Sequence, residues 1–306
     1  MKVAIIYYCY NRIEHTKKSL SKILEFKSDM PLYIFCDGYK VDKEDEVDEV
    51  RRFVKKKQKS FSETEIIFRN ENLGLAKNVI TGVNSVFEKG FDGVIVLEDD
   101  CVPYQEFFKY MFDALNKYKN VNEVKHISGF GLPLNFKFTC DNYFTPYPCS
   151  WGWATWKAEW VKCNFEDDKY YNEILNTPIL KSKFDYSGKS FSHFLKLQLE
   201  GEVNSWLVRW YAHIFKYNGL SSWAVNTCVK NTGFDGTGEH RVSYDRFNQN
   251  KKIVKENYNF EASYNLNPVV IREFKQHFMG PKLIDKIKTM IYLKTGIILE
   301  KTSKKY

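Results

Sequence analysis

Three consecutive acids, Glu98, Asp99 and Asp100, are the residues of this sequence best placed to do chemistry, within the stretch GVIVLEDDCVP. The apolar run VIVL before them predicts a buried strand, so the acids would lie at its tip, where their mutual repulsion is poorly screened. A divalent cation would relieve this repulsion, and Mg²⁺ or Mn²⁺ prefers carboxylate oxygens completed by water and substrate phosphate. A solvated acidic turn is the alternative for an isolated Glu-Asp-Asp.

Short apolar runs in the first part of the chain supply the elements that would position these acids. They recur roughly every thirty residues, at 3–8, 32–36, 65–68 and 94–97. The segments between them carry apolar residues at helical spacing, as at Leu75, Val79 and Val83. Strands that alternate with helices at this period predict βαβ units, and therefore an α/β fold with a mostly parallel central sheet flanked by helices.

Polar residues follow each of these runs, at the carboxyl ends of the expected strands, where ligands bind in such sheets. Before the three acids they are Asn11, Arg12, Asp37, Arg69, Asn72 and Lys77. Acids and amides suit a base and ribose, cations suit phosphates and carboxylates suit a metal, so this set fits a nucleotide with a diphosphate. No G-x-G-x-x-G follows the first run, which argues against a dinucleotide-binding dehydrogenase.

Aromatic and glycine-rich segments mark the second half of the chain. The stretch PCSWGWATWKAEW contains Trp151, Trp153 and Trp156, and Gly152 leaves space beside a ring. We expect at least one of these rings to face a planar or sugar-like ligand, with core packing as the alternative. The later stretch NTGFDGTGEHR predicts a flexible loop that could close over a ligand.

Charge and cysteine content narrow the class of protein. The net charge is +8, and residues 281–306 supply most of it, with seven lysines against two acids. The nearly balanced body argues against nucleic-acid binding. Seven cysteines without a C-x-x-C pair suit reduced thiols, the first apolar run is too short for a signal peptide, and no run reaches the ~20 apolar residues of a membrane span. These features predict a cytoplasmic protein, soluble or held on the inner face of the cell membrane.

Together the motifs resemble those of GT-A fold glycosyltransferases, which use nucleotide-sugar donors. CYNR resembles their opening strand, and RNENLGLAKN resembles an R-x-x-N-x-G-x-x-x-N element at Arg69, Asn72, Gly74 and Asn78. LEDD resembles the Glu-Asp-Asp motif of the inverting N-acetylglucosaminyltransferase I. SWGWATWKAEW is similar to a glycine-tryptophan segment of that enzyme and of bacterial family 2-like transferases of surface polysaccharides such as lipopolysaccharide. The resemblance covers roughly residues 1–240.

The resemblance implies an inverting hexosyl- or N-acetylhexosaminyltransferase that uses a nucleotide-diphosphate sugar, first of all a UDP-sugar, and Mn²⁺ or Mg²⁺. Asp37 would contact the nucleobase or ribose, Asp100 would bind the metal, and Glu98 and Asp99 would meet ribose and sugar hydroxyls. The other donor-binding candidates are Asn11, Arg12, Arg69, Asn72, Gly74, Lys77, Asn78, Trp151, Gly152 and Trp153. The acceptor would be a growing cell-surface glycan or a lipid-linked saccharide.

An inverting transfer also needs a carboxylate that takes the proton of the acceptor hydroxyl. The resembled enzymes carry it just before a tryptophan, where this chain has Asn204 and Ser205, so Glu202 is the first candidate and Asp235 the second. A solvated helix-entry residue is the alternative for Glu202. His240 is a candidate extra metal ligand, and an exposed or structural histidine is the alternative.

We expect one domain with a nucleotide-sugar-binding half at 1–103 and an acceptor-binding and catalytic half at 104–260. Residues 261–306 would form a basic amphipathic helical tail, whose segment 281–306 could contact an anionic membrane or cap the domain. Two other functions stay open. A sugar nucleotidyltransferase usually has a Gly-rich phosphate loop after its first strand, absent here. A non-catalytic glycan-binding protein would explain Asn204 in place of an acid.

Overall fold

The computed structural model describes the whole chain except residues 27, 59–62, 189, 236–254, 279–289 and 291–306. Its strands are β1 (Val3–Cys9), β2 (Leu32–Cys36), β3 (Thr64–Phe68), β4 (Gly93–Glu98), β5 (Cys101–Pro103), β6 (Val124–Ser128), β7 (Asn142–Thr145), β8 (Trp153–Trp156), β9 (Leu220–Ala224) and β10 (Val229–Asn231). Its helices are α1 (Ile13–Glu25), α2 (Glu44–Lys57), α3 (Gly74–Glu88), α4 (Phe107–Tyr118), α5 (Lys157–Trp160), α6 (Asp168–Asn176), α7 (Pro178–Phe184), α8 (Phe191–Leu199), α9 (Trp206–Lys216) and α10 (Pro268–His277).

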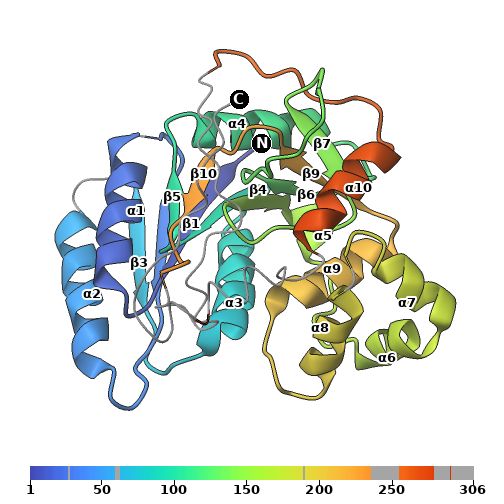
Figure 1. The fold of residues 1–306 in the computed structure, drawn as a ribbon. Helices are drawn as coiled ribbons and strands as arrows, with labels where there is room; N and C mark the ends of the chain where they lie inside the picture. Colours follow the sequence, from blue (N-terminus) through green and yellow to red (C-terminus); the bar gives the residue numbers. More distant parts are fainter. Residues whose placement is uncertain (27, 59–62, 189, 236–254, 279–289, 291–306) are drawn as a thin grey trace.

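Eight of the strands form one mixed sheet in the order β3-β2-β1-β4-β8-β6-β9-β7. The first four pair in parallel, and so do β6 and β9, whereas β8 is antiparallel to both of its neighbours and β7 is antiparallel to β9. The four apolar runs predicted as strands are β1 to β4. The predicted α/β fold, with a mostly parallel sheet flanked by helices, is confirmed (Figure 1).

The helix α2 illustrates how local sequence produces the elements around the sheet. Val47, Val50 and Val54 recur at helical spacing and are fully buried, so one stripe of the helix faces the core. Acids occupy the first turn, 44–46, and lysines the last, 55–57. This order of charges complements the helix dipole and stabilises both ends of the helix.

The sheet has a hydrophobic core on each face. Side chains of β1 alternate between the two, as the pleat of a strand requires. Ile5 and Tyr7 pack in the core to which α1, α2, α4 and α10 contribute, whereas Ile6 and Tyr8 pack in the core to which α3 and α9 contribute. The helices α1, α2 and α4 therefore cover one face of the sheet, and α3 and α9 cover the other.

A smaller helical group, made of α6, α7 and α8, packs against α9 beside the sheet (Figure 1). In its core the rings of Phe184 and Tyr211 lie 4.2 Å apart, and the Tyr211 hydroxyl donates to the Phe184 carbonyl at 2.6 Å. The opposite side of α9 carries Trp206 and Trp210, which belong to a core of the sheet. The helix α9 therefore joins the small group to the main body.

The order of the first four strands reverses direction at β1. The chain passes from β1 outward to β2 and β3, and then returns to place β4 on the other side of β1. Ligands of open α/β sheets bind at such a switch in strand order, outside the carboxyl ends of the strands. The short strand β10 pairs antiparallel with β5, directly after β4, and so brings residues 231–235 back to this point.

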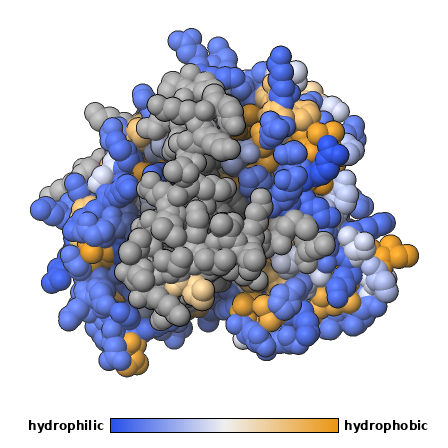
Figure 2. Space-filling model, viewed as in Figure 1, coloured by the Kyte–Doolittle hydropathy of each residue, from blue (hydrophilic) through white to orange (hydrophobic). Residues whose placement is uncertain are grey.

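Most of the coloured side chains on one face of the molecule are hydrophilic (Figure 2). Figure 2 shows mainly hydrophilic side chains on the viewed face, with hydrophobic side chains in small separate groups. In the part of the chain that the structure describes, no helix combines the length and apolar character needed to cross a bilayer. The predicted tail segment 281–306 lies outside the described residues apart from Met290, as does His240.

Candidate functional site

Arg12 and two of the three acids meet where β1 and β4 end side by side. Tyr8 pairs with Glu98 in the register of these strands, so the residues that follow both strands share one edge of the sheet. Arg12 donates through Nε to Asp99 Oδ2 at 3.3 Å and through Nη2 to Asp99 Oδ1. The same Nη2 donates to Asp100 Oδ2 at 3.0 Å. A two-pronged guanidinium contact of this kind fixes a carboxylate in orientation as well as in charge.

Burial controls the electrostatics of this group. Asp99 is only 3 % exposed, and burial raises its pKa to about 6 even though Arg12 acts to lower it. Burial lowers the pKa of Arg12, but Asp99 and Asp100 outweigh that effect and raise its pKa overall. At neutral pH the site therefore holds an ionised Asp99 beside a charged Arg12.

The segment after β10 packs directly on Asp100. The Thr232 amide donates to the Asp100 carbonyl at 2.8 Å, and the Thr232 hydroxyl lies 3.1 Å from the same oxygen. A Cβ on Gly233 would lie 2.5 Å from Asp100 Oδ2, so any larger residue at this position would push the carboxylate aside. The Gly233 amide donates to Asn231 Oδ1 at 2.7 Å, which holds the turn.

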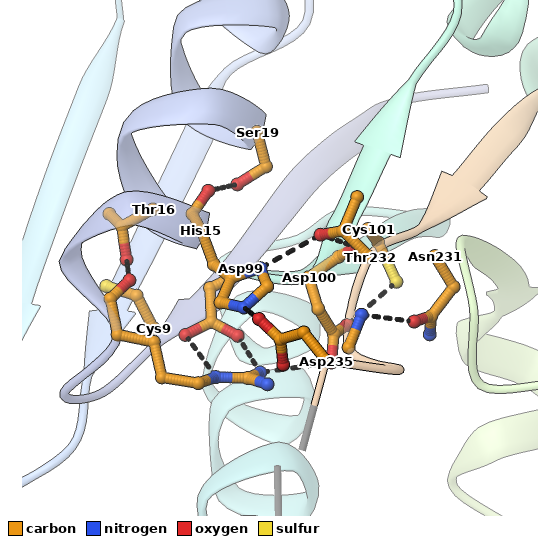
Figure 3. Close-up of polar contacts among 12 residues, drawn as sticks. Cys9, His15, Thr16, Ser19, Asp99, Asp100, Cys101, Asn231, Thr232 and Asp235 are labelled. Carbon is orange, nitrogen blue, oxygen red and sulfur yellow. Dashed lines mark hydrogen bonds and ion pairs between the residues drawn. The ribbon is translucent and has the colours of Figure 1, made fainter. Parts of the chain in front are cut away.

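His15 connects this segment to α1. Figure 3 shows its ring between Thr232 and Asp235. The Nδ1 atom lies 2.9 Å from Thr232 Oγ1 and the Nε2 atom 2.9 Å from Asp235 Oδ2. His15 follows Arg12 by three residues and lies on the same helical face. The structure thus brings Asp235 into the group that contains Asp99 and Asp100.

The Asp37 carboxylate is held by backbone amides at the end of β2. Its Oδ1 accepts from the amides of Gly38 and Leu73, both at 2.9 Å, and its Oδ2 accepts from the Gly74 amide at 3.1 Å. Leu73 and Gly74 begin α3, whose first amides lack partners within the helix. Asn72 Nδ2 adds a bond to the Gly38 carbonyl at 2.9 Å. Asp37 therefore caps α3, and its predicted contact with the nucleotide stays a prediction.

Arg69 and Asn78 also bond to each other inside the protein. Arg69 Nε donates to Asn78 Oδ1 at 3.2 Å, Nη2 donates to Thr81 Oγ1 at 3.1 Å, and the guanidinium lies 5.0 Å from the Phe35 ring centroid. The R-x-x-N-x-G-x-x-x-N element thus holds the β3–α3 junction against the end of β2. Lys77, by contrast, is exposed on α3.

Arg51 is a residue of this region that the sequence motifs did not single out. Its Nη2 donates to the carbonyls of Asp37 at 3.0 Å and Arg69 at 2.6 Å. The guanidinium also lies 4.6 Å from the Tyr39 ring and 5.2 Å from the Phe68 ring. A signal was present in the sequence, because position 51 lies four residues after buried Val47 and so borders the buried stripe of α2.

The tryptophan segment divides between core and site. Trp153 is fully buried, and its ring stacks on Trp206 at 4.6 Å and on His126 at 5.6 Å. Trp156 is buried as well. Trp151 is half-buried and contacts the ring of Phe234 edge-on at 5.5 Å. Of the three rings, Trp151 is therefore the one that touches the segment carrying Asp235.

Gly152 shapes the backbone between these rings. Its φ of 65° lies in the left-handed region, and a Cβ there would approach the Phe107 ring to 2.8 Å. The Gly129 amide donates to the Gly152 carbonyl at 2.8 Å. The glycine is thus required by the packing beneath the segment, whether or not a ligand stacks above it.

The remaining predicted residues, Asn11, Glu98, Glu202 and His240, differ in position and in exposure. Asn11 is half-buried between β1 and α1, and Glu98 is the last residue of β4. Glu202 is exposed in the turn between α8 and α9, where its amide donates to the Leu197 carbonyl at 3.0 Å. His240 lies outside the described residues. The structure thus brings together Arg12, Asp99, Asp100 and Asp235.

The carboxylates of this site can be tested as ligands of a divalent cation. Among the described residues, no group of three or more histidines, cysteines or acids could hold a metal. Mg²⁺, however, takes one or two carboxylates and completes its shell with water and substrate phosphates. The side chain of Asp100 is 15 % exposed and that of Asp99 5 %. These residues fit a cation that Asp100 shares with a bound diphosphate, rather than one held by protein alone.

Comparison with known proteins gives structural neighbours but no sequence relatives. No protein-family model matches the chain, and no curated protein matches it. One similar solved structure is the mannosyltransferase PcManGT from Pyrobaculum calidifontis in complex with GDP-Man and Mn²⁺, with 11 % identity over 71 % of this chain and 69 % of that chain, and a TM-score of 0.39. Another is TarS 1–349 from S. aureus, with 14 % identity over 75 % of this chain and 59 % of that chain, and a TM-score of 0.44. What the site does must therefore follow from its own geometry.

Proposed function

We propose that this protein is a GT-A-type glycosyltransferase that moves a sugar from a nucleotide-diphosphate donor, first of all a UDP-sugar, to a glycan or lipid-linked saccharide. The observation that carries the proposal is the meeting of Arg12, Asp99 and Asp100 at the switch in strand order between β1 and β4. This is the part of an α/β sheet where a nucleotide binds. A guanidinium and a carboxylate there can serve a diphosphate and its cation.

The reaction would break the bond between the anomeric carbon and the diphosphate oxygen and form a bond from that carbon to the acceptor oxygen. Charge then develops on the leaving nucleoside diphosphate, and preorganised positive groups stabilise it. When bound, the metal would contribute as a Lewis acid at the phosphate oxygens. Arg12 would keep Asp99 and Asp100 oriented toward the donor, because it donates to both carboxylates.

The proton of the acceptor hydroxyl would pass to a carboxylate, with inversion at the anomeric carbon. This proposal assigns that role to Asp235 ahead of Glu202. Asp235 contacts His15 in the group that contains Asp100, whereas Glu202 is exposed in the α8–α9 turn. A carboxylate can act as base only within hydrogen-bond reach of the acceptor, directly or through one water.

The test is a panel of UDP, GDP, CMP and dTDP sugars, incubated with the full chain with and without Mn²⁺, followed by calorimetry and by detection of the released nucleotide. Metal-dependent release of a nucleoside diphosphate is expected. The proposal would be overturned if none of the donors bound and none was turned over. Nucleoside triphosphate formed on addition of pyrophosphate would instead support a nucleotidyltransferase, and glycan binding without any release of nucleotide would support a binding protein.

Variants of the acids then assign the roles. Asp100→Asn is expected to abolish metal-dependent turnover, and retained activity would reject Asp100 as the metal ligand. Asp235→Asn should lower turnover far more than Glu202→Gln. The reverse order would return the role of base to Glu202.

The acceptor of this proposal is a growing bacterial surface polysaccharide, and the enzyme would act at the inner face of the cell membrane. Residues 281–306 contain seven lysines and two acids, and this positive charge supports a location at an anionic membrane. Co-sedimentation with vesicles of anionic and of neutral lipid, for the chain with and without 281–306, would measure the contribution of the segment. Equal sedimentation of both forms would remove it from the proposal.

A further inference from the structure

We infer that His15 is a positioning residue of the proposed reaction. It fastens Thr232 and Asp235 to the first turns of α1 and so sets the direction in which the Asp235 carboxylate faces. The inference rests on the proposed function, because it gives a reason for Asp235 to be held in place. The contact joins α1 to the segment after β10, and no sequence motif links these two parts of the chain.

Both nitrogens of the His15 ring are engaged on the same short segment. Nδ1 lies 2.9 Å from Thr232 Oγ1, and Nε2 lies 2.9 Å from Asp235 Oδ2. The two partners are three residues apart, so a single rigid ring spans the turn between them. His15 itself is only 9 % exposed, and its ring is therefore held by α1 while it holds the segment.

The hydrogen bonds join into one chain from Asp100 to Asp235. The Thr232 hydroxyl has one proton, and the Asp100 carbonyl at 3.1 Å can only accept it. The same hydroxyl oxygen lies 2.9 Å from His15 Nδ1, and the Asp235 carboxylate lies 2.9 Å from Nε2 on the other side of the ring. The backbone of Asp100 and the side chain of Asp235 are thus oriented through one imidazole.

The two ends of the segment 232–235 are held in different ways, and the position of the Asp235 carboxylate depends on this difference. At one end, Gly233 packs on Asp100 Oδ2 with no room for a side chain. At the other, the Asp235 side chain is 45 % exposed, so burial does little to fix its direction. The hydrogen bond to the buried His15 ring is directional and constrains the orientation of this carboxylate. A small displacement of a reacting group costs on the order of 100-fold in rate.

A matched pair of variants tests the inference. In His15→Gln the side-chain amide reaches the position of Nε2 and can donate to Asp235, whereas in His15→Asn it reaches the position of Nδ1 and can donate to Thr232. We expect His15→Asn to lower kcat about 100-fold with little change in donor KM, and His15→Gln to recover most of that loss. His193→Asn, on the exposed face of α8, is the control and should match the wild type. Equal kcat in the Asn variant and the wild type would overturn the inference.

A second measurement does not depend on the reaction. The unfolding equilibrium constants of His15→Asn, Asp235→Asn and the double variant form a thermodynamic cycle. The contact predicts that the second substitution has a smaller effect when the first is present, and additive effects would overturn the inference. Coupling in the cycle together with an inactive wild type would reject the proposed function and leave the contact intact. Additive effects in an active wild type would reject the role of His15 alone.

Discussion

Arg12 Nη2 lies 3.0 Å from Asp100 Oδ2, and the same nitrogen also donates to Asp99. One guanidinium from the start of α1 therefore joins both carboxylates that follow β4. Because β1 and β4 are parallel neighbours, their carboxyl ends deliver these groups to the same point. Three adjacent acids can end the buried strand β4 because Arg12, just after the end of the neighbouring strand β1, neutralises part of their charge.

Removing this partner should destabilise the protein. Arg12→Ala would leave Asp99 buried without its counter-charge, and breaking a buried ion pair in this way costs about 3–5 kcal/mol. Urea unfolding of the variant and the wild type measures the difference in free energy of unfolding. The exposed Arg52 provides the matched control, and Arg52→Ala should change that free energy very little. The double variant Arg12→Ala, Asp99→Asn should recover part of the loss, and equal effects of the two single arginine variants would contradict the role of Arg12.

The cap on α3 predicts a second effect on stability. Asp37→Ala would remove the acceptor of the Gly38, Leu73 and Gly74 amides. Unsatisfied buried amides and a lost helix cap cost about 1–3 kcal/mol. Thermal and urea unfolding should show this loss, whereas Asp29→Ala at an exposed turn should not. If Asp37→Ala unfolded like the wild type while donor affinity fell, the carboxylate would serve the ligand and not the helix.

Gly233→Ala should affect the site more than the fold. The new Cβ would meet Asp100 Oδ2 at 2.5 Å, and a side-chain end can move aside at small cost in stability. The displaced carboxylate would lose its contact with Arg12 and its orientation toward the proposed cation. We expect the Mn²⁺ concentration for half-maximal donor binding to rise about tenfold, which corresponds to about 1.4 kcal/mol. Calorimetric titration of the donor at several Mn²⁺ concentrations measures this, and an unchanged Mn²⁺ dependence would contradict the placement of the metal beside Asp100.

The sequence predicted the framework of the site because the relevant signals are local. Each of the strands β1 to β4 is a short apolar run, and the residue that follows it is fixed by chain continuity. Arg12 and the acids of β4 could therefore be placed at one sheet edge from spacing alone. The bond between them was not predictable, since strand order decides which ends are neighbours.

The contacts that complete the site join residues far apart in the chain. His15 and Asp235 are 220 positions apart, and only the pairing of β10 with β5 brings them together. Composition likewise does not say which tryptophan is buried: Trp153 packs in the core, whereas Trp151 reaches the β10 segment. Trp151 lies before β8, and Gly152, with its left-handed φ of 65°, turns the chain between the two rings. Neither the start of β8 nor this turn can be read from the composition of the segment.

A buried histidine in β6 predicts how stability depends on pH. Trp210 Nε1 donates to His126 Nδ1 at 3.2 Å, so Nδ1 is an acceptor and the proton of the neutral ring lies on Nε2, 3.0 Å from the Cys149 carbonyl. Burial lowers the pKa of His126 to about 3. As the pH falls below the ordinary histidine value of about 6.5, the unfolded chain binds a proton that the folded protein does not.

The contribution of His126 to the free energy of unfolding should therefore fall with decreasing pH between about 6.5 and 4, by up to about 1.4 kcal/mol per pH unit. His126→Gln removes the titrating ring and keeps a side chain with both donor and acceptor, so it should flatten the pH dependence at some cost in stability at neutral pH. Urea unfolding at intervals between pH 4.5 and 7.5 measures both slopes. His193→Gln, at an exposed position, should keep the wild-type slope. Parallel curves for His126→Gln and the wild type would show that His126 is protonated in the folded protein, in conflict with the indole bond that it accepts.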